Sequence, residues 1–108
     1  MKKIILLILG IALTFNVFAD VAKGQRYYLK YLRPYFQMTG NKFAGQNLKI
    51  EWKQLFKKKA KKFIKKYSKK YPEASEFLHG DKFQKIAPDV GDFVKKYAAD
   101  SGEIASCS

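Results

Sequence analysis

The chain has 108 residues and a formal net charge of +13, from 22 Lys and Arg against nine Asp and Glu. It contains one Cys and one His, which excludes an internal disulfide, a Cys-rich zinc or iron–sulfur site and a multi-histidine metal site. The length accommodates one small domain.

The first 19 residues have the three parts of a secretory signal peptide. Lys2 and Lys3 form a basic start, an uncharged apolar stretch follows, and Ala19 closes a run of small or modest side chains suited to signal peptidase. The apolar stretch has about 15 residues, fewer than the roughly 20 needed to span a bilayer. We therefore predict cleavage after Ala19 and a periplasmic or secreted protein, with one domain over residues 20–102 and a flexible tail over residues 103–108.

The apolar pattern of the mature chain has helical period throughout. A first helix is predicted to begin at Asp20 and to end near Arg33, because the proline that follows excludes the helical conformation from the residue before it. Residues 35–46 contain two glycines and are predicted to form a loop. The longest helix is predicted over residues 48–71, where apolar side chains recur every three or four positions.

Shorter elements are predicted for the C-terminal third of the chain. Pro72 suits the first turn of a third helix, which Gly80 would end. A short turn is expected before Pro88, followed by a last helix from Asp89 that Gly102 would terminate. The prediction is a small all-α domain of three main helices and one or two short ones, with an unusually aromatic core.

Basic residues concentrate in the segment 47–71, which holds eleven Lys and a single acid, Glu51. Like charges four residues apart on a helix repel by a few tenths of a kcal/mol per pair, so this density exceeds that of an ordinary solvated face and indicates a cationic binding surface. An acidic protein or an anionic membrane surface would be attracted to it, whereas nucleic acid is the poorest partner for an exported protein. The candidate binding residues are Lys57, Lys58, Lys61, Lys62, Lys65, Lys66, Lys69 and Lys70.

Two further residues have potentially reactive side chains. His79 precedes a glycine and is expected to interact with the last carbonyl groups of its helix. Cys107 is one residue from the C-terminus, where it could form an intermolecular disulfide that links a homodimer, or be inert. We find no general acid–base pair and no phosphate-binding or calcium-binding loop, and we expect no enzyme activity.

Both ends of the mature chain resemble small class I cytochromes c. Residues 24–28 resemble their first helix, in which a glycine packs against the C-terminal helix, and residues 92–98 resemble that C-terminal helix. The window that holds the C-x-x-C-H haem attachment in those proteins reads LRPYF here, over residues 32–36. The resemblance therefore implies the cytochrome c-like fold without covalent haem, and no cofactor is expected.

The whole mature chain is also similar to a family of small exported bacterial proteins described as cytochrome c-like although they lack the haem motif. The similarity lies in residues 24–31, 40–44, 51–52, 56, 100–102 and 106–107. It implies a haem-free binding or accessory module. Two alternatives stay open: a protein that binds haem without covalent attachment, through Met38 or His79, in association with electron transfer, and a cationic membrane-active protein.

Overall fold

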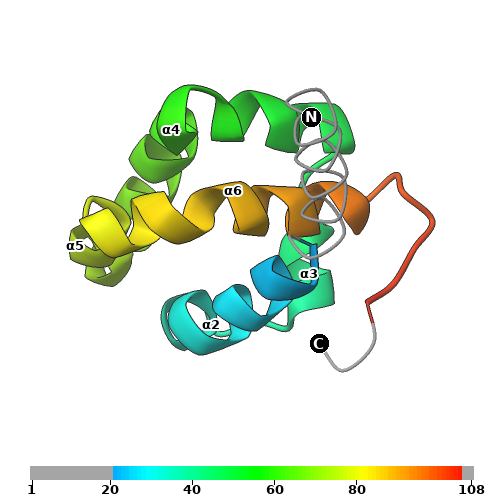
Figure 1. Ribbon diagram of the computed structural model, residues 1–108, viewed down its shortest axis with the longest axis horizontal. Coiled ribbons are helices and arrows are strands. Elements are labelled where there is room, and N and C mark those ends of the chain that lie inside the picture. The colour runs from blue at the N-terminus through cyan, green and yellow to red at the C-terminus, as the bar shows by residue number, and fades with distance from the viewer. Residues whose placement is uncertain (1–20, 106–108) are drawn as a thin grey trace, which may run out of the picture.

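The computed structural model describes residues 21–105 (Figure 1). Every element in this range is helical, which confirms the predicted all-α class. The predicted signal peptide and its cleavage site lie outside the described residues. Residues 21–27 form the first helical segment. The elements that follow are the π-helix η1 (Tyr28–Leu32), α2 (Arg33–Phe36), α3 (Gly40–Ala44), α4 (Lys49–Lys70), the 3₁₀-helix η2 (Pro72–Ala74), α5 (Ser75–Leu78) and α6 (Asp81–Lys96).

The prediction that the first helix ends near Arg33 is wrong. Its backbone passes through η1, where the hydrogen bonds span five residues instead of four, and continues as α2. Pro34 lies in the first turn of α2, where a backbone N–H has no obligatory acceptor within the helix. The chain leaves the helix at Gln37, which has a left-handed φ of 55° and donates its N–H to the Arg33 carbonyl over 2.7 Å.

The predicted loop over residues 35–46 contains the helix α3. Thr39 caps it, since its side-chain oxygen accepts a hydrogen bond of 3.1 Å from the backbone N–H of Lys42. Phe43 and Ala44 of α3 have no exposed surface. A helix of one turn is too short to show a period in the sequence, so its apolar pair gave no helical signal.

The C-terminal helix also differs from its prediction, because α6 runs unbroken over Asp81–Lys96 with Pro88 inside it. Proline removes one backbone hydrogen bond, but Pro88 lies on the exposed side of the helix. The burial of Phe83, Phe93 and their neighbours on the opposite side outweighs that loss. The helix ends before Gly102, which adopts a left-handed φ of 73° in the segment that follows.

The first helix crosses α6 at Gly24, where the resemblance of residues 24–28 to the first helix of class I cytochromes c implied a close approach. A Cβ atom added to Gly24 would overlap the backbone carbonyl oxygen of Asp89 and would lie 2.8 Å from the Cβ atom of Phe93. One turn further along, the ring centroid of Tyr28 lies 6.2 Å from that of Phe93. The crossing therefore requires the glycine that the sequence provides.

A continuous cluster of aromatic rings forms the core between the first helix, α3, α4 and α6. The ring of Phe43 is stacked on that of Tyr28 at a centroid distance of 4.6 Å and lies 5.2 Å from that of Trp52. The indole N–H of Trp52 donates a hydrogen bond of 2.8 Å to the carbonyl of Ala44. These contacts fix α3 against α4 and leave the outer side of α4 free of the core.

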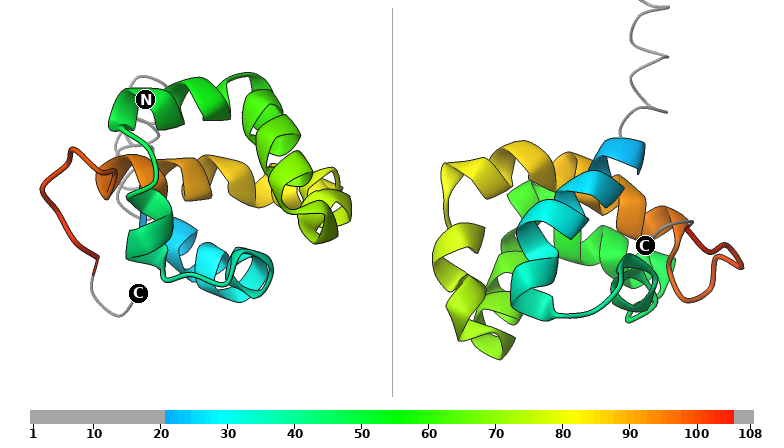
Figure 2. Two further views of the ribbon diagram at one scale, coloured as in Figure 1. Left: turned by 180° about the vertical axis from the view of Figure 1, so that it is seen from behind. Right: turned by 90° about the horizontal axis from the view of Figure 1, so that it is seen from below.

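Helix α4 bends sharply between two straight halves, of which the first runs along the top of Figure 1 and the second descends toward α5. Figure 2 shows the same bend from behind. Lys57 has an extended backbone with ψ of 154°. The next three residues have left-handed φ values of 52°, 59° and 60°: Lys58, Lys59 and Ala60. The sequence pattern predicted the bounds of this helix to within a residue but not its bend.

The bend is held from the inside of the molecule. Ala60 is buried, and the side-chain amide of Gln84 on α6 donates a hydrogen bond of 3.1 Å to the carbonyl oxygen of Lys59. The rings of Phe56 and Phe63, one from each half of α4, pack at a centroid distance of 4.7 Å across the bend. A left-handed conformation costs an L-residue about 1–2 kcal/mol, and these contacts offset that cost.

Lys59→Gly is expected to raise the free energy of unfolding by about 1 kcal/mol. Glycine adopts the left-handed conformation without the steric cost of a Cβ atom, and this gain exceeds the extra conformational entropy that glycine adds to the unfolded chain. Lys62→Gly removes the same charge from a right-handed turn and should instead cost about 1 kcal/mol. Urea unfolding followed by circular dichroism measures both signs, and a loss of stability in Lys59→Gly would contradict the left-handed bend.

Hydrogen bonds of two side chains, Asn41 and Asp100, attach the segment after α6 to the rest of the domain. The Asn41 side-chain amide donates a hydrogen bond of 2.8 Å to the carbonyl of Ala105, and its oxygen accepts one of 2.7 Å from the N–H of the same residue. The carboxylate of Asp100 accepts a hydrogen bond of 2.9 Å from the backbone N–H of Lys49 and so satisfies a donor in the first turn of α4. The start of α4 is therefore tied to the C-terminal segment.

Candidate anion-binding site

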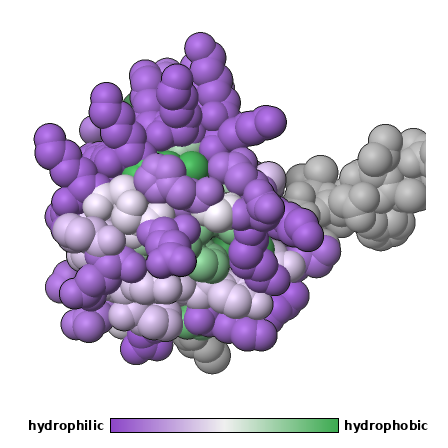
Figure 3. Space-filling view, turned by 90° about the vertical axis from the view of Figure 1, so that its left-hand side faces the viewer, coloured by the Kyte–Doolittle hydropathy of each residue, from purple (hydrophilic) through white to green (hydrophobic). Residues whose placement is uncertain are grey.

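The side chains of α4 divide between two faces. Trp52, Phe63 and Tyr67 are buried in the aromatic core, whereas the eight predicted binding lysines are all exposed. Both ion pairs found among residues 21–105 join lysines of α6 to nearby carboxylates, so neither neutralises a lysine of α4. Figure 3 looks at the end of the molecule where α4 bends, and hydrophilic side chains project from the upper part of this face.

Five of these lysines surround a hollow of about 480 Å³ at the bend, which we call the kink pocket. Its lining residues are Gln54, Lys57, Lys58, Lys61, Lys62 and Lys65. An adjoining hollow of about 450 Å³ shares three of these lysines and adds Lys59, Ile64, His79 and Gln84. No carboxylate lines either hollow, so the positive charge of the kink pocket is not balanced by an acid of its own lining.

The other three predicted lysines follow the second half of α4 toward its C-terminus. The Nζ atoms of Lys66 and Lys70 lie 5.9 and 5.8 Å from the ring centroids of Tyr67 and Tyr71. Lys69 is exposed between them on the same half of the helix. The structure thus divides the predicted set into five lysines at the bend and three along the rest of the helix.

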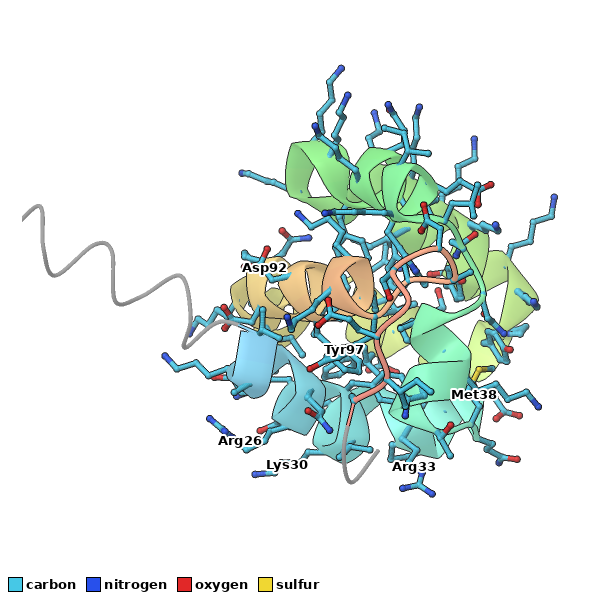
Figure 4. The ribbon with its side chains drawn as sticks, turned by 90° about the vertical axis from the view of Figure 1, so that its right-hand side faces the viewer. Arg26, Lys30, Arg33, Met38, Asp92 and Tyr97 are labelled. Atoms are coloured by element: carbon cyan, nitrogen blue, oxygen red, sulfur yellow. The ribbon has the colours of Figure 1, made fainter. Side chains whose placement is uncertain are left out.

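The two candidate haem ligands are engaged in separate local contacts. Met38 lies in the turn between α2 and α3 (Figure 4), where its Sδ accepts a hydrogen bond of 3.3 Å from the side chain of Gln46. His79 follows α5, and its Nδ1 donates a hydrogen bond of 2.8 Å to the carbonyl of Ser75. His79 thus contacts a backbone carbonyl of its own helix, as predicted, but the acceptor is the first residue of α5 and not one of the last.

Aromatic rings occupy the interior that non-covalent haem would need. The ring of Phe36 lies 4.8 Å from that of Tyr71 and 5.5 Å from that of Tyr67, and Tyr67 is stacked on Phe63 at 4.4 Å. Rings at these separations are close-packed and leave no space for a porphyrin between them. A hollow of about 800 Å³ between α4 and α6 is lined by neither candidate ligand.

A second basic surface, on the first helix, was missed in the sequence. Its exposed members follow the three- and four-residue spacing of one helical face: Lys23, Arg26, Lys30 and Arg33. Three of them are labelled in Figure 4 and point outward from the same side of the first helix. Next to them, the ring of Tyr31 is approached by the Nζ atoms of Lys30 and Lys82 at 5.3 and 4.9 Å. The three- and four-residue spacing of the four basic residues in the sequence could have revealed this surface.

The protein environment shifts the pKa of three tyrosines in two directions. Burial raises the pKa of Tyr28 and of Tyr67. The hydroxyl of Tyr28 donates a hydrogen bond of 2.7 Å to the carbonyl of Met38, and that of Tyr67 donates one of 3.3 Å to the side-chain oxygen of Gln46. A hydrogen bond from Lys82 lowers the pKa of the half-buried Tyr31.

Stability is expected to fall as the pH rises above about 10, the usual pKa of tyrosine, because the folded protein retains phenolic protons that the unfolded chain releases. The contribution of Tyr28 and Tyr67 is complete below that pH and is lost as the pH rises toward their folded-state pKa. Tyr67→Phe should therefore make the free energy of unfolding less dependent on pH in this range. The lowered pKa of Tyr31 has the opposite effect, because it increases the free energy of unfolding as the pH rises toward 10. Tyr31→Phe should remove this increase.

Urea unfolding from about pH 8 to about pH 11 measures both effects. Deprotonation of the lysines is common to the wild type and the variants, so the difference between them isolates each tyrosine. The assignment would be refuted by identical pH profiles for the wild type and Tyr67→Phe.

Comparison with known proteins adds no relative from which a function could be carried over. No protein-family model, no curated protein and no solved structure matches this chain. Within residues 21–105, no group of three or more His, Cys, Asp or Glu side chains is arranged to hold a metal ion. None of the helices in that range is long and apolar enough to cross a membrane. Cys107 lies outside the described residues.

Proposed function

We propose that the protein is an exported, haem-free binding module that attaches to an anionic partner through the exposed lysines of α4. The observation that carries the proposal is the arrangement of eight exposed lysines on one helix, none of them paired with a carboxylate of residues 21–105. Such a surface attracts negative charge along residues 57–70 and accelerates encounter with an oppositely charged partner. An acidic protein and an anionic membrane surface both supply that charge.

Attachment at the surface is favoured over insertion into a bilayer. A membrane-active helix needs apolar side chains that can enter the headgroup region, but the aromatic side chains of α4 pack in the core or against it. Among residues 21–105, the exposed large apolar residues are Leu48, Ile50 and Ile104, and the first two lie at the N-terminal end of α4, away from the bend. The eight exposed lysines of α4, which we call the lysine face, therefore present charge, and none of these three exposed apolar residues lies among them.

A charge-reversal experiment tests the proposal. One variant replaces Lys61, Lys62, Lys65 and Lys66 by Glu, and a matched control replaces Lys23, Arg26, Lys30 and Arg33 by Glu. Both change the net charge equally, but only the first acts on α4. With about 1 kcal/mol per lysine near an anionic surface, the α4 variant should bind roughly 100-fold or more weakly, and the control should retain most of its affinity.

Binding is measured on vesicles of phosphatidylglycerol, on phosphatidylcholine vesicles as the uncharged comparison, and on an immobilised acidic protein. Preference for the vesicles or for the acidic protein identifies the class of partner. Equal losses in the α4 variant and the control would show that only net charge matters, and would refute the assignment to α4. Circular dichroism confirms that both variants are folded.

An intact-mass spectrum of protein purified from the periplasm, recorded without reductant together with a visible spectrum, tests export and the absence of haem. The expected result is the mass of residues 20–108 with no Soret band. An uncleaved mass would contradict export by a cleaved signal peptide, and a haem-sized increment with a Soret band would contradict the haem-free assignment. A doubled mass that is lost on reduction would show a homodimer linked through Cys107, since the chain has one cysteine.

A further inference from the structure

The kink pocket has the properties of a discrete ligand site within the lysine face. Lysines on both sides of the bend line it: Lys57 precedes the left-handed residues, Lys58 is the first of them, and Lys61, Lys62 and Lys65 follow. The neutral side chain of Gln54 completes the lining, and no acid contributes. Five lysine side chains thus line a single hollow of about 480 Å³.

The backbone that carries these lysines is fixed from inside. The hydrogen bond between Gln84 and the carbonyl of Lys59, the burial of Ala60 and the packing of Phe56 on Phe63 all act on the bend itself. Three consecutive left-handed residues without a glycine are costly, and such conformations persist where the surrounding structure holds them and cluster at ligand-binding positions. The lysine stems therefore start from a backbone that is already arranged before a ligand arrives.

The chemistry of the lining selects a compact ligand of high negative charge. The like charges of five neighbouring lysines repel each other, and a single multivalent anion relieves more of that repulsion than separate carboxylates spread along a protein surface. A phosphate group carries nearly two charges and three acceptor oxygens at neutral pH, and lysine binds phosphate as a point charge from any direction. Two linked phosphates would match five lysines better than one.

We infer that the kink pocket binds a diphosphate or a similarly compact, multiply charged phosphate group. This inference rests on the proposed function, since it names the chemistry that one part of the lysine face recognises. Lys66, Lys69 and Lys70 then supply the less specific attraction along the second half of α4. The phosphate can be free in solution or carried by a lipid headgroup, and both sources present the same oxygens to the lysines.

The test measures binding of inorganic pyrophosphate to the mature protein by isothermal titration calorimetry, with sulfate as the comparison anion. Lys58→Gln/Lys61→Gln removes two charges from the kink pocket, and Lys66→Gln/Lys70→Gln removes two charges from outside it. We expect one pyrophosphate per chain, a loss of affinity of about tenfold or more in the first variant and less than about threefold in the second. Gln84→Ala, which alters no charge but removes the hydrogen bond to the bend, should weaken pyrophosphate binding as well.

Vesicles distinguish the two sources of phosphate. If the ligand is a headgroup, vesicles of phosphatidic acid, a phosphomonoester lipid, should bind more tightly than phosphatidylglycerol vesicles of equal charge, and pyrophosphate should compete with them. If it is free phosphate, pyrophosphate should bind without this preference between lipids. Equal losses in the two double variants, or no pyrophosphate binding by a protein that still binds phosphatidylglycerol vesicles, would overturn the inference and leave the proposed function standing. Loss of binding to every anionic surface would overturn both.

Discussion

Gly24→Ala is expected to lower the free energy of unfolding by about 3 kcal/mol or more, beyond the usual cost of overpacking. The added methyl group would overlap the carbonyl oxygen of Asp89, and it would lie 2.6 Å from the carbonyl carbon of the same residue and 2.8 Å from the Cβ atom of Phe93. None of these atoms can rotate away, because two belong to the backbone and the third is attached to it. The helices would have to separate, and the contact between Tyr28 and Phe93 would loosen.

Gly80→Ala is the matched control for the glycine substitution. The added methyl group would meet its nearest neighbour, the carbonyl oxygen of Phe77, at 3.4 Å, and the residue has an extended backbone with φ of −90°. Its effect should stay within about 1 kcal/mol. Thermal and urea unfolding followed by circular dichroism compare the two variants. If Gly24→Ala is as stable as Gly80→Ala, the first helix does not approach α6 as closely as described.

Long amphipathic periodicity explains why α4 could be predicted well. The apolar residues of the segment recur over about six helical turns, and so long a pattern identifies both the helix and its buried face. The bend was not predictable by the same reasoning. In a sequence, a Gly or an Asn is what normally indicates a left-handed backbone conformation. Lys58, Lys59 and Ala60 have no such local feature. The bend is held by contacts with residues of α6, which lie far from it in the sequence.

Two of the three prolines, Pro34 and Pro88, were interpreted as helix ends, and both lie within helical structure. Pro34 follows a π-helical segment and opens the next turn, and Pro88 faces solvent on a helix whose other side is buried. Proline acts locally, but tertiary burial decides whether a helix continues through it. The residues next to each proline in the sequence do not indicate that burial.

The lysines of the candidate site were identified from their density, but the supports of α4 were not. Asp100 reaches the first turn of α4 from 51 residues away, and Asn41 binds the backbone of Ala105 across 64 residues. Hydrogen bonds between such distant positions leave no pattern in a single sequence. The pocket at the bend was unpredictable for the same reason, since it depends on the hydrogen bond from Gln84.

Trp52→Ala is expected to lower the free energy of unfolding by about 4 kcal/mol, the cost of removing a large buried aromatic side chain. Trp52 has no exposed surface, and its ring lies 5.2 Å from that of Phe43 and 6.2 Å from those of Phe63 and Tyr67. Its removal leaves a cavity at the centre of the aromatic cluster. The carbonyl of Ala44 also loses its hydrogen-bond donor.

Trp52→Phe measures the contribution of the indole hydrogen bond to stability separately from that of ring packing. It keeps an aromatic ring but leaves the carbonyl of Ala44 without the indole donor, which should cost about 1–3 kcal/mol. Trp52 is the single tryptophan of the chain, so unfolding of both variants is followed by circular dichroism rather than by tryptophan fluorescence. The side chain lies in the half of α4 that precedes the bend and faces away from the lysines, so Trp52→Phe, while folded, should bind anionic vesicles like the wild type. A stability loss in Trp52→Ala no larger than that in Trp52→Phe would mean that the hydrogen bond, and not the ring packing, fixes the first half of α4 on α3.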